Sequence, residues 1–252
     1  MNNLTLCALT FALLSSVSIL CMYLHSRLPE NHQDAVTAAT VSKIANIFVV
    51  ITSLVFGLLI TSSKSTFENI DRNIHSYATE LILLDRILRN YGTDASPARA
   101  ALRAYVAEAI AHPAQTDELE HLQSDTAGQA LDRVGAAIDA VQPIDPFHER
   151  QLANIQASYR DVVRKRWIIV EQSEGAIPNP ITAMVIAWLT LIFASFGYRA
   201  PKNAIVVSML IVSSLLISGS LYLILDMNIP FKGPIKVSYE PYHRALNEMQ
   251  QP

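Results

Sequence analysis

The chain has 252 residues, of which 51% are apolar and 16% charged, and its formal net charge is −3. An ordinary soluble domain carries about 25% charged residues, so the composition argues against a soluble globular protein. The sequence contains no basic patch with interleaved aromatic residues, and we therefore expect no binding of nucleic acid.

Long stretches without Asp, Glu, Lys or Arg predict four transmembrane helices. These stretches are residues 4–23, 44–63, 181–198 and 203–225. Each is close to the roughly 20 residues with which a helix crosses about 30 Å of hydrocarbon. The alternative is a very apolar soluble bundle, but a core helix of such a bundle normally keeps a polar face, and these stretches have none.

The order of the stretches predicts an all-α protein with a cytoplasmic helical bundle inserted between transmembrane helices two and three. We expect a first transmembrane pair over residues 1–63, a cytoplasmic helical region over 64–177, a second transmembrane hairpin over 178–226 and a C-terminal cytoplasmic segment over 227–252. Nine Lys and Arg residues flank the membrane on the side of the central region and four on the other side. This bias predicts a multi-pass protein of the cell inner (plasma) membrane with both termini in the cytoplasm.

The first apolar stretch has a signal peptide as its alternative interpretation. Residues 1–3 carry no charged side chain, the stretch is longer than a usual signal-peptide core, and no clear cleavage site follows it, so we expect a retained helix. Both cysteines, Cys7 and Cys21, lie in this stretch. About 21 Å of helix would separate them, which is too far for a disulfide bond.

The second apolar stretch has no natural end on its cytoplasmic side. From residue 43 to residue 91 there is no proline, and Gly57 is the only glycine. A continuous helix over this range would be about 73 Å long. Apolar residues in its second half recur at alternating spacings of four and three, a heptad pattern typical of a helical bundle. They are Ile70, Ile74, Tyr77, Leu81, Leu84, Leu88 and Tyr91, preceded by Phe67.

Capping residues and prolines place the remaining helices. Ser96-Pro97 predicts a helix start, and we expect helices over 96–111, about 117–141, about 147–174 and 242–250. Residues 164–167, Arg-Lys-Arg-Trp, leave two interpretations open: a position in the lipid headgroup layer, or an ordinary solvated helix end. The fourth apolar stretch is rich in Ser and Gly, which favours close helix packing and leaves a polar path as the alternative.

Signatures of catalysis are absent from the sequence. It contains no glycine-rich phosphate loop, no Gly-x-Ser-x-Gly elbow and no His/Cys cluster with metal-ligand spacing. The four apolar stretches also contain no charge that would mark a proton or ion relay. We therefore expect no enzyme activity, no catalytic residues, no metal site and no cofactor.

Three segments of the sequence resemble the bestrophin-like domain family of bacterial and plant membrane proteins. They are residues 54–60 with 63–67 (LVFGLLI and SKSTF), 193–203 (FASFGYRAPKN) and 223–233 (LILDMNIPFKG). The resemblance covers nearly the whole chain. It implies kinship to bestrophins, which are pentameric anion channels, and hence a homo-oligomer in the lipid bilayer, with five copies as the implied number and a small inorganic ion as the substrate.

The same resemblance implies that the second transmembrane helix lines a central pore. Phe48, Thr52 and Phe56, spaced by four, are the predicted pore-lining residues, because an apolar constriction can gate a pore by dewetting. Contact of the phenylalanines with lipid or with a neighbouring helix is the alternative. Lys64 and Arg72 follow on the cytoplasmic side, where positive charge would attract anions to the pore mouth.

The sequence thus supports a leading functional hypothesis and a rival. The first is an oligomeric, bestrophin-like passive channel, with anions as its preferred ions. The rival is a non-conducting membrane scaffold or sensor whose cytoplasmic bundle binds a partner. Calcium gating of the bestrophin kind is not expected, because Pro230-Phe231 is followed by no carboxylate until Glu240.

Overall fold

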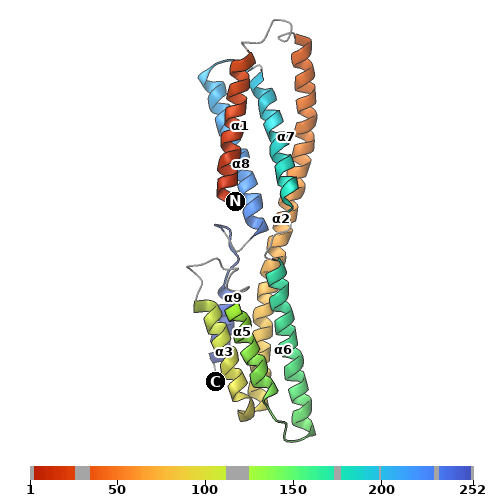
Figure 1. Cartoon of the computed structure of the whole chain (residues 1–252), viewed down its shortest axis with the longest axis vertical. Helices are drawn as coiled ribbons and strands as arrows, with labels where there is room; N and C mark the ends of the chain where they lie inside the picture. The colour runs from red at the N-terminus through yellow and green to blue at the C-terminus, as the bar shows by residue number, and fades with distance from the viewer. Residues whose placement is uncertain are drawn as a thin grey trace. The chain divides into compact units, whose positions relative to one another are not determined.

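The computed structural model describes residues 3–25, 35–111, 125–172, 177–198, 200–229 and 233–250, and these ranges contain helices and no strand. Figure 1 shows their order along the chain. The helices are α1 (Asn3–His25), α2 (Ala35–Tyr91), the short 3-10 helix η2 (Thr93–Ala95), α3 (Ser96–Ala111), α5 (Asp125–Asp139), α6 (Pro146–Gln172), α7 (Asn179–Tyr198), α8 (Ala204–Asn228) and α9 (Glu240–Gln250).

Four of these helices, α1, α2, α7 and α8, are long and apolar enough to cross a membrane. The prediction of an all-α fold with four transmembrane helices is therefore confirmed. Helix α2 is much longer than a bilayer requires, because no proline interrupts it and Gly57 is the only glycine within its 57 residues. It ends where Gly92 takes a positive φ of 111°, a conformation that glycine adopts without steric cost.

The chain divides into two compact units, to both of which α2 contributes. The membrane unit comprises Met1–Ser65 and Ala176–Asn228. The bundle unit comprises Thr66–Gly175 and Ile229–Pro252. All four candidate membrane helices have their apolar segments in the membrane unit, whereas α3, α5, α6 and α9 belong to the bundle unit.

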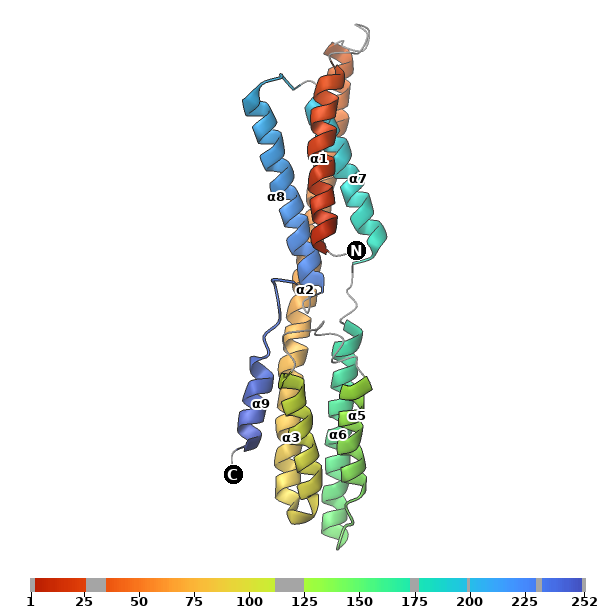
Figure 2. The same cartoon turned by 60° about the vertical axis from the view of Figure 1, so that its left-hand side comes forward.

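Within the membrane unit, α1 lies alongside α7 and α8 (Figure 2). A cluster that includes Leu14 of α1, Leu59 of α2 and Phe193 of α7 forms its core. Gly197 makes the closest approach of two backbones possible, since a Cβ at this position would collide with the carbonyl oxygen of Ser18. Small residues allow membrane helices to pack by van der Waals contact, which is their main source of association in lipid.

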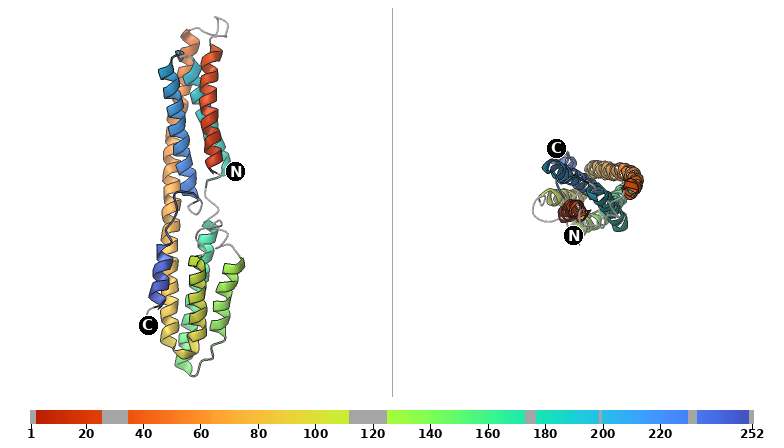
Figure 3. Two further views of the ribbon diagram at one scale, coloured as in Figure 1. Left: turned by 90° about the vertical axis from the view of Figure 1, so that its left-hand side faces the viewer. Right: turned by 90° about the horizontal axis from the view of Figure 1, so that it is seen from above.

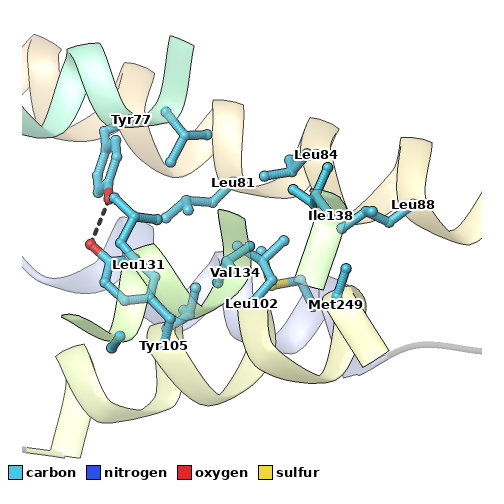
Figure 4. Close-up of a cluster of buried hydrophobic side chains, with 14 of the residues drawn as sticks. Tyr77, Leu81, Leu84, Leu88, Leu102, Tyr105, Leu131, Val134, Ile138 and Met249 are labelled. Carbon is cyan, nitrogen blue, oxygen red and sulfur yellow. Dashed lines mark hydrogen bonds between the residues drawn. The ribbon is translucent and has the colours of Figure 1, made fainter. Parts of the chain in front are cut away.

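The bundle unit buries the heptad side of α2 against α3, α5, α6 and α9 (Figures 3 and 4). Every predicted heptad position from Ile70 to Tyr91 is buried, so the heptad prediction is confirmed. Figure 4 shows Leu102 and Val134 facing this stripe, with Met249 of α9 beside them. The core is therefore built from one apolar stripe of each helix, as in soluble helical bundles.

Local capping places the ends of the bundle helices. Asp145 precedes α6, and its Oδ1 accepts hydrogen bonds from the backbone N–H groups of Phe147 and His148 at 2.9 and 2.8 Å. The hydrogen bonds from His148 hold the pKa of Asp145 below its usual value. Helix α3 occupies the predicted range, and α9 covers the predicted final helix. Residues 117–124 and 173–174, which were also predicted to be helical, lie outside the described residues.

Candidate functional site

The membrane part of α2 has an inner side that packs on the rest of its own unit. Thr52 is only 5% exposed, and Leu59 and Ser63 are also buried. Phe56 packs against two apolar clusters, one around Leu14 of α1 and one around Leu221 of α8. This side of α2 thus contributes to the core of the single subunit.

The predicted pore-lining residues lie on or next to this inner side. Thr52 is buried. Phe48 and Phe56, each one turn away from Thr52, are both partly buried. The structure therefore brings the three residues together along α2, where Thr52 and Phe56 meet other helices of the same chain.

The outer side of α2 carries a second apolar stripe that the sequence analysis did not single out. Val50, Leu54 and Leu58, spaced by four, are 68%, 68% and 63% exposed. Sequence alone does not distinguish this stripe from the one at Phe48, Thr52 and Phe56, because both lie in the same charge-free segment with the same spacing. The distinction depends on which side the other helices cover.

Small residues line the helix beside the outer apolar stripe. Ser53, Gly57 and Thr61 are exposed and also spaced by four. The hydroxyls of Ser53 and Thr61 donate to the carbonyls of Val49 and Gly57 at 2.8 and 2.9 Å, so both are satisfied within the helix. A Cβ at Gly57 would have no atom within 4 Å. The outer side of α2 can therefore accept another helix at short distance.

The predicted pore-mouth charges are exposed on α2. Lys64 is exposed at the end of the apolar segment. Arg72 has a side chain that is 64% exposed, and its guanidinium lies 3.9 Å from the carboxylate of Glu68 and donates to Asn69 Oδ1 at 2.5 Å. The positive charge of Arg72 is thus partly offset by Glu68.

One buried carboxylate lies at the end of α8 and was not predicted as a site. Asp226 is 1% exposed and forms a side-chain hydrogen bond with Tyr222 one turn earlier. The sequence analysis placed Asp226 at the very end of the predicted hairpin, directly after the charge-free stretch that ends at Leu225. The structure continues α8 to Asn228, so this acidic group belongs to the helix itself.

Several polar groups in the bundle unit are paired with each other, and one of these groups also contacts α9. Asp85 accepts two hydrogen bonds from Arg99, at 2.9 and 3.2 Å, and Arg99 also donates to the Met249 carbonyl at 3.3 Å. The hydroxyls of Tyr77 and Tyr105 share a hydrogen bond of 2.6 Å (Figure 4). Burial raises the pKa of Tyr77 well above its usual value. In the described part of the chain, no cluster of His, Cys, Asp or Glu is suited to hold a metal ion.

These features describe an all-helical membrane protein with four candidate membrane helices, the second of which continues into a helical bundle. The chain belongs to the bestrophin-like family, because the model of the bestrophin-like domain matches residues 12–242. The resemblance drawn from the sequence motifs is thereby confirmed.

Solved structures of a bacterial bestrophin homologue from Klebsiella pneumoniae share the fold. One mutant form superposes with a TM-score of 0.69 at 13% sequence identity, covering 97% of this chain and 99% of the other. A second has a TM-score of 0.66 at 14% identity, with the same coverage of both chains. A third gives 0.66 at 14%, covering 99% of this chain and 97% of the other. A comparison with curated protein sequences gives no match.

Proposed function

We propose that the chain forms a passive pathway for small inorganic ions, with anions preferred, across the cell inner membrane. The observation that supports this proposal best is the outer side of α2, where Val50, Leu54 and Leu58 are exposed in a helix that belongs to a bestrophin-like fold. Several copies of such a helix around an axis would form an apolar constriction, which admits ions only when it is hydrated.

Assembly of identical copies follows from the same helix. The exposed small residues Ser53, Gly57 and Thr61 lie beside the apolar stripe and would let the α2 helices of neighbouring copies approach closely. Kinship to bestrophins favours five copies. The bundle unit and both termini would lie in the cytoplasm, as the distribution of Lys and Arg indicates.

Two stripes on α2 compete for the role of the constriction. A pathway on the axis between copies would use the outer stripe, Val50, Leu54 and Leu58, because these side chains are available to a neighbour. A pathway through the helices of one subunit would use Phe48, Thr52 and Phe56. The second set stays a prediction, and the burial of Thr52 and the packing of Phe56 favour the axial arrangement.

Positive charge next to the constriction gives the preference for anions. Lys64 follows the apolar segment directly, and Arg72 lies about 12 Å further along the helix. Repeated in every copy, Lys64 would form a ring of positive charge that raises the local anion concentration. Arg72, part of whose charge Glu68 offsets, would add to this positive charge.

Conductance of the purified protein in planar bilayers tests the proposal. Leu54→Ala should raise the single-channel conductance, because it widens the axial constriction, whereas Phe56→Ala should alter stability more than conductance. Leu216→Ala, at an exposed position of α8, is the matched control and should leave conductance unchanged. Lys64→Glu should shift the reversal potential in a salt gradient toward cation selectivity.

The proposal fails if no preparation conducts and neither Leu54→Ala nor Phe56→Ala changes any measured flux. A conductance that responds to Phe48→Ala and Phe56→Ala but not to Leu54→Ala would instead place the pathway inside the subunit.

A non-conducting scaffold is the alternative function. It is favoured by the exposed side chains of Ile144, which precedes α6, and Phe147, in the first turn of α6, since exposed apolar residues on a soluble bundle mark contact surfaces. This function would be supported over the channel by two results together. The protein would be a monomer without conductance, and Phe147→Ala would abolish the binding of a partner protein.

A further inference from the structure

Four helices of the bundle unit each bring one polar side chain into its core. They are Tyr77 of α2, Tyr105 of α3, Arg166 of α6 and Tyr242 of α9. All four are buried, with exposed fractions of 0%, 3%, 6% and 3%. Helical bundles build their ligand sites in the core from side chains on facing helices, and convergent polar groups are typical of such sites. The four residues, named the tyrosine–arginine cluster, are therefore a candidate binding site.

The contacts among the four side chains place their polar ends close together. The hydroxyls of Tyr77 and Tyr105 share a hydrogen bond of 2.6 Å (Figure 4), and the guanidinium of Arg166 donates a hydrogen bond to Tyr105. The rings of Tyr77 and Tyr242 meet edge to face, with their centroids 6.0 Å apart. The charge of Arg166 also acts on the phenols of Tyr77 and Tyr242, so all three phenols lie near one guanidinium.

One hydroxyl of the cluster, that of Tyr242, is buried with no hydrogen-bond partner among the described residues. Burial raises the pKa of Tyr242 well above its usual value, whereas the positive charge of Arg166 acts in the opposite direction. A buried hydroxyl without a partner costs free energy, and in folded proteins such a group is commonly explained by a bound water molecule or ion. The Tyr242 hydroxyl therefore has a proton to donate to an occupant of the cluster.

The chemistry of the cluster favours an occupant that accepts hydrogen bonds and carries negative charge. A guanidinium can only donate, and each phenol can donate its O–H proton. Besides other tyrosines, the group whose charge acts on the three phenols in the described part of the chain is Arg166. Positive charge in a protein interior attracts an anion more strongly than it does in water, and hydrogen bonds to a charged acceptor are the stronger ones. An anion is thus favoured over a water molecule.

Tyr91 provides a comparison within the same unit. Its hydroxyl is also buried without a hydrogen-bond partner among the described residues, about 21 Å further along α2 than Tyr77. Burial, and then the negative charges of Asp94 and Asp145, raise the pKa of Tyr91. The surroundings of Tyr91 are therefore negative, whereas those of Tyr242 are positive. An anion is expected at Tyr242 and not at Tyr91.

We propose that the tyrosine–arginine cluster binds a monatomic inorganic anion, a halide, held by the Tyr242 hydroxyl and the Arg166 guanidinium. Because the rings of Tyr77 and Tyr242 are already in contact, a monatomic ion suits the cluster better than a larger oxyanion. The bound ion connects α9 to α6 and so stabilises the docking of α9. The site lies within the bundle unit, and it requires neither conduction nor a second copy of the chain.

Thermal unfolding of the full chain in mild detergent tests the binding, with sodium bromide exchanged for sodium gluconate at constant ionic strength. Bromide should raise the unfolding temperature of the parent protein in a saturable way. Tyr242→Phe should unfold at the parent's temperature in gluconate and should need about tenfold more bromide for half of the shift, because it loses a hydrogen bond to a charged group. Tyr91→Phe, the matched control, should keep the bromide dependence of the parent.

Two results of this experiment would overturn the site. One is an unfolding temperature of the parent that does not respond to bromide, and the other is an equal response of the parent and Tyr242→Phe. Neither result bears on the proposed channel, because the experiment measures no conductance. A protein that binds bromide in the cluster and does not conduct would refute the channel and leave the site intact.

Anomalous diffraction from crystals of the parent protein grown in bromide locates the ion without any variant. We expect a bromide peak within hydrogen-bond distance of both the Tyr242 hydroxyl and the Arg166 guanidinium. A water molecule at this position, with no anomalous signal, would refute the proposal. Bromide peaks on the protein surface alone would show an adventitious ion only and would refute it as well.

Discussion

The membrane unit and the bundle unit are both built from helices, but they differ in which side chains they bury. In the membrane unit, apolar residues occur all around each helix, and many, such as Leu54 and Leu216, stay exposed. In the bundle unit, the apolar residues of α2 form one stripe, and that stripe is buried. The difference teaches that hydrophobicity specifies the contacts of a helix in water, whereas in lipid the small residues do.

Buried polar groups differ between the units in the same way. In the bundle unit, Asp85 is paired with Arg99, and the Tyr77 hydroxyl with that of Tyr105. In the membrane unit, hydroxyls such as those of Thr10 and Ser214 donate to carbonyls one turn back in their own helix. Polar pairing thus connects helices in the bundle unit. In the membrane unit, some buried hydroxyls bond within their own helix, and those of Thr52, Ser63 and Ser218 have no hydrogen-bond partner among the described residues. The following substitutions test this contrast.

The largest effect is expected at the closest backbone contact of the membrane unit. Gly197→Leu should destabilise the protein by about 3 kcal/mol or more, because the new side chain must push α7 away from Ser18 of α1. Gly219→Leu is the matched control on α8, where no atom lies within 4 Å of the added Cβ. Thermal unfolding in mild detergent measures both. Equal losses for the two variants would contradict the role of small residues in this unit.

The next effect is expected at the buried ion pair of the bundle unit. Asp85→Ala should cost about 2–3 kcal/mol, because it leaves the charge of Arg99 partly buried without its carboxylate. Asp161→Ala removes the exposed partner of Arg164 and should cost less than about 1 kcal/mol. Chemical unfolding followed by circular dichroism compares them. If Asp161→Ala lowers the unfolding free energy as much as Asp85→Ala does, burial does not control how much these ion pairs contribute to stability.

A smaller effect is expected at the tyrosine pair. Tyr77→Phe should cost about 1 kcal/mol, because it removes the hydrogen bond with Tyr105. Tyr242→Phe should be close to neutral, because the buried Tyr242 hydroxyl has no hydrogen-bond partner among the described residues. Denaturant unfolding measures the unfolding free energy of both variants. A larger fall for Tyr242→Phe than for Tyr77→Phe would contradict the prediction.

The same tyrosines predict a dependence on alkaline pH. Burial raises the pKa of Tyr77 in the folded state, so its contribution to stability is complete below the unfolded value of about 10. As pH rises above that value, the unfolded chain releases the phenol proton first, and stability falls until the folded pKa is reached. Tyr77→Phe should flatten this fall in unfolding free energy between pH 9 and 11, at about the range where phenols titrate.

The smallest effect is expected at the helix cap of α6. Asp145→Ala should lower the melting temperature slightly at neutral pH, because it removes the acceptor of two backbone N–H groups. The lowered pKa of Asp145 means that its contribution is present above the unfolded pKa and is lost as pH falls through the folded one. The difference in melting temperature from the parent should therefore vanish in acid. Glu248→Ala, at an exposed position of α9, is the control.

Several features were predictable because they depend on one segment at a time. The absence of charge over 44–63 and the heptad pattern from Ile70 to Tyr91 both report on a single helix and its solvent. The start of α3 at Ser96 and the end of α2 before Gly92 depend on backbone preferences within one turn. The sequence motifs at 193–203 and 223–233 likewise identified the family without a structure.

The candidate site was only partly predictable, because it depends on which side of α2 is covered. The stripe with Phe48, Thr52 and Phe56 and the stripe with Val50, Leu54 and Leu58 have the same spacing and similar polarity. Only the packing of α1, α7 and α8 shows that Thr52 is buried and Leu54 is exposed. The tyrosine–arginine cluster has the same origin, since its four residues come from four different helices.

The sequence by itself determined the four long apolar segments, the heptad stripe and the unbroken length of α2, because hydrophobic period and backbone propensity depend on neighbouring residues in the chain. The tertiary structure alone decided the close contact of Gly197 with Ser18, the pairing of Asp85 with Arg99 and the outward side of α2. These depend on residues that are far apart in the chain, and in lipid no hydrophobic stripe reveals which side of a helix will meet another.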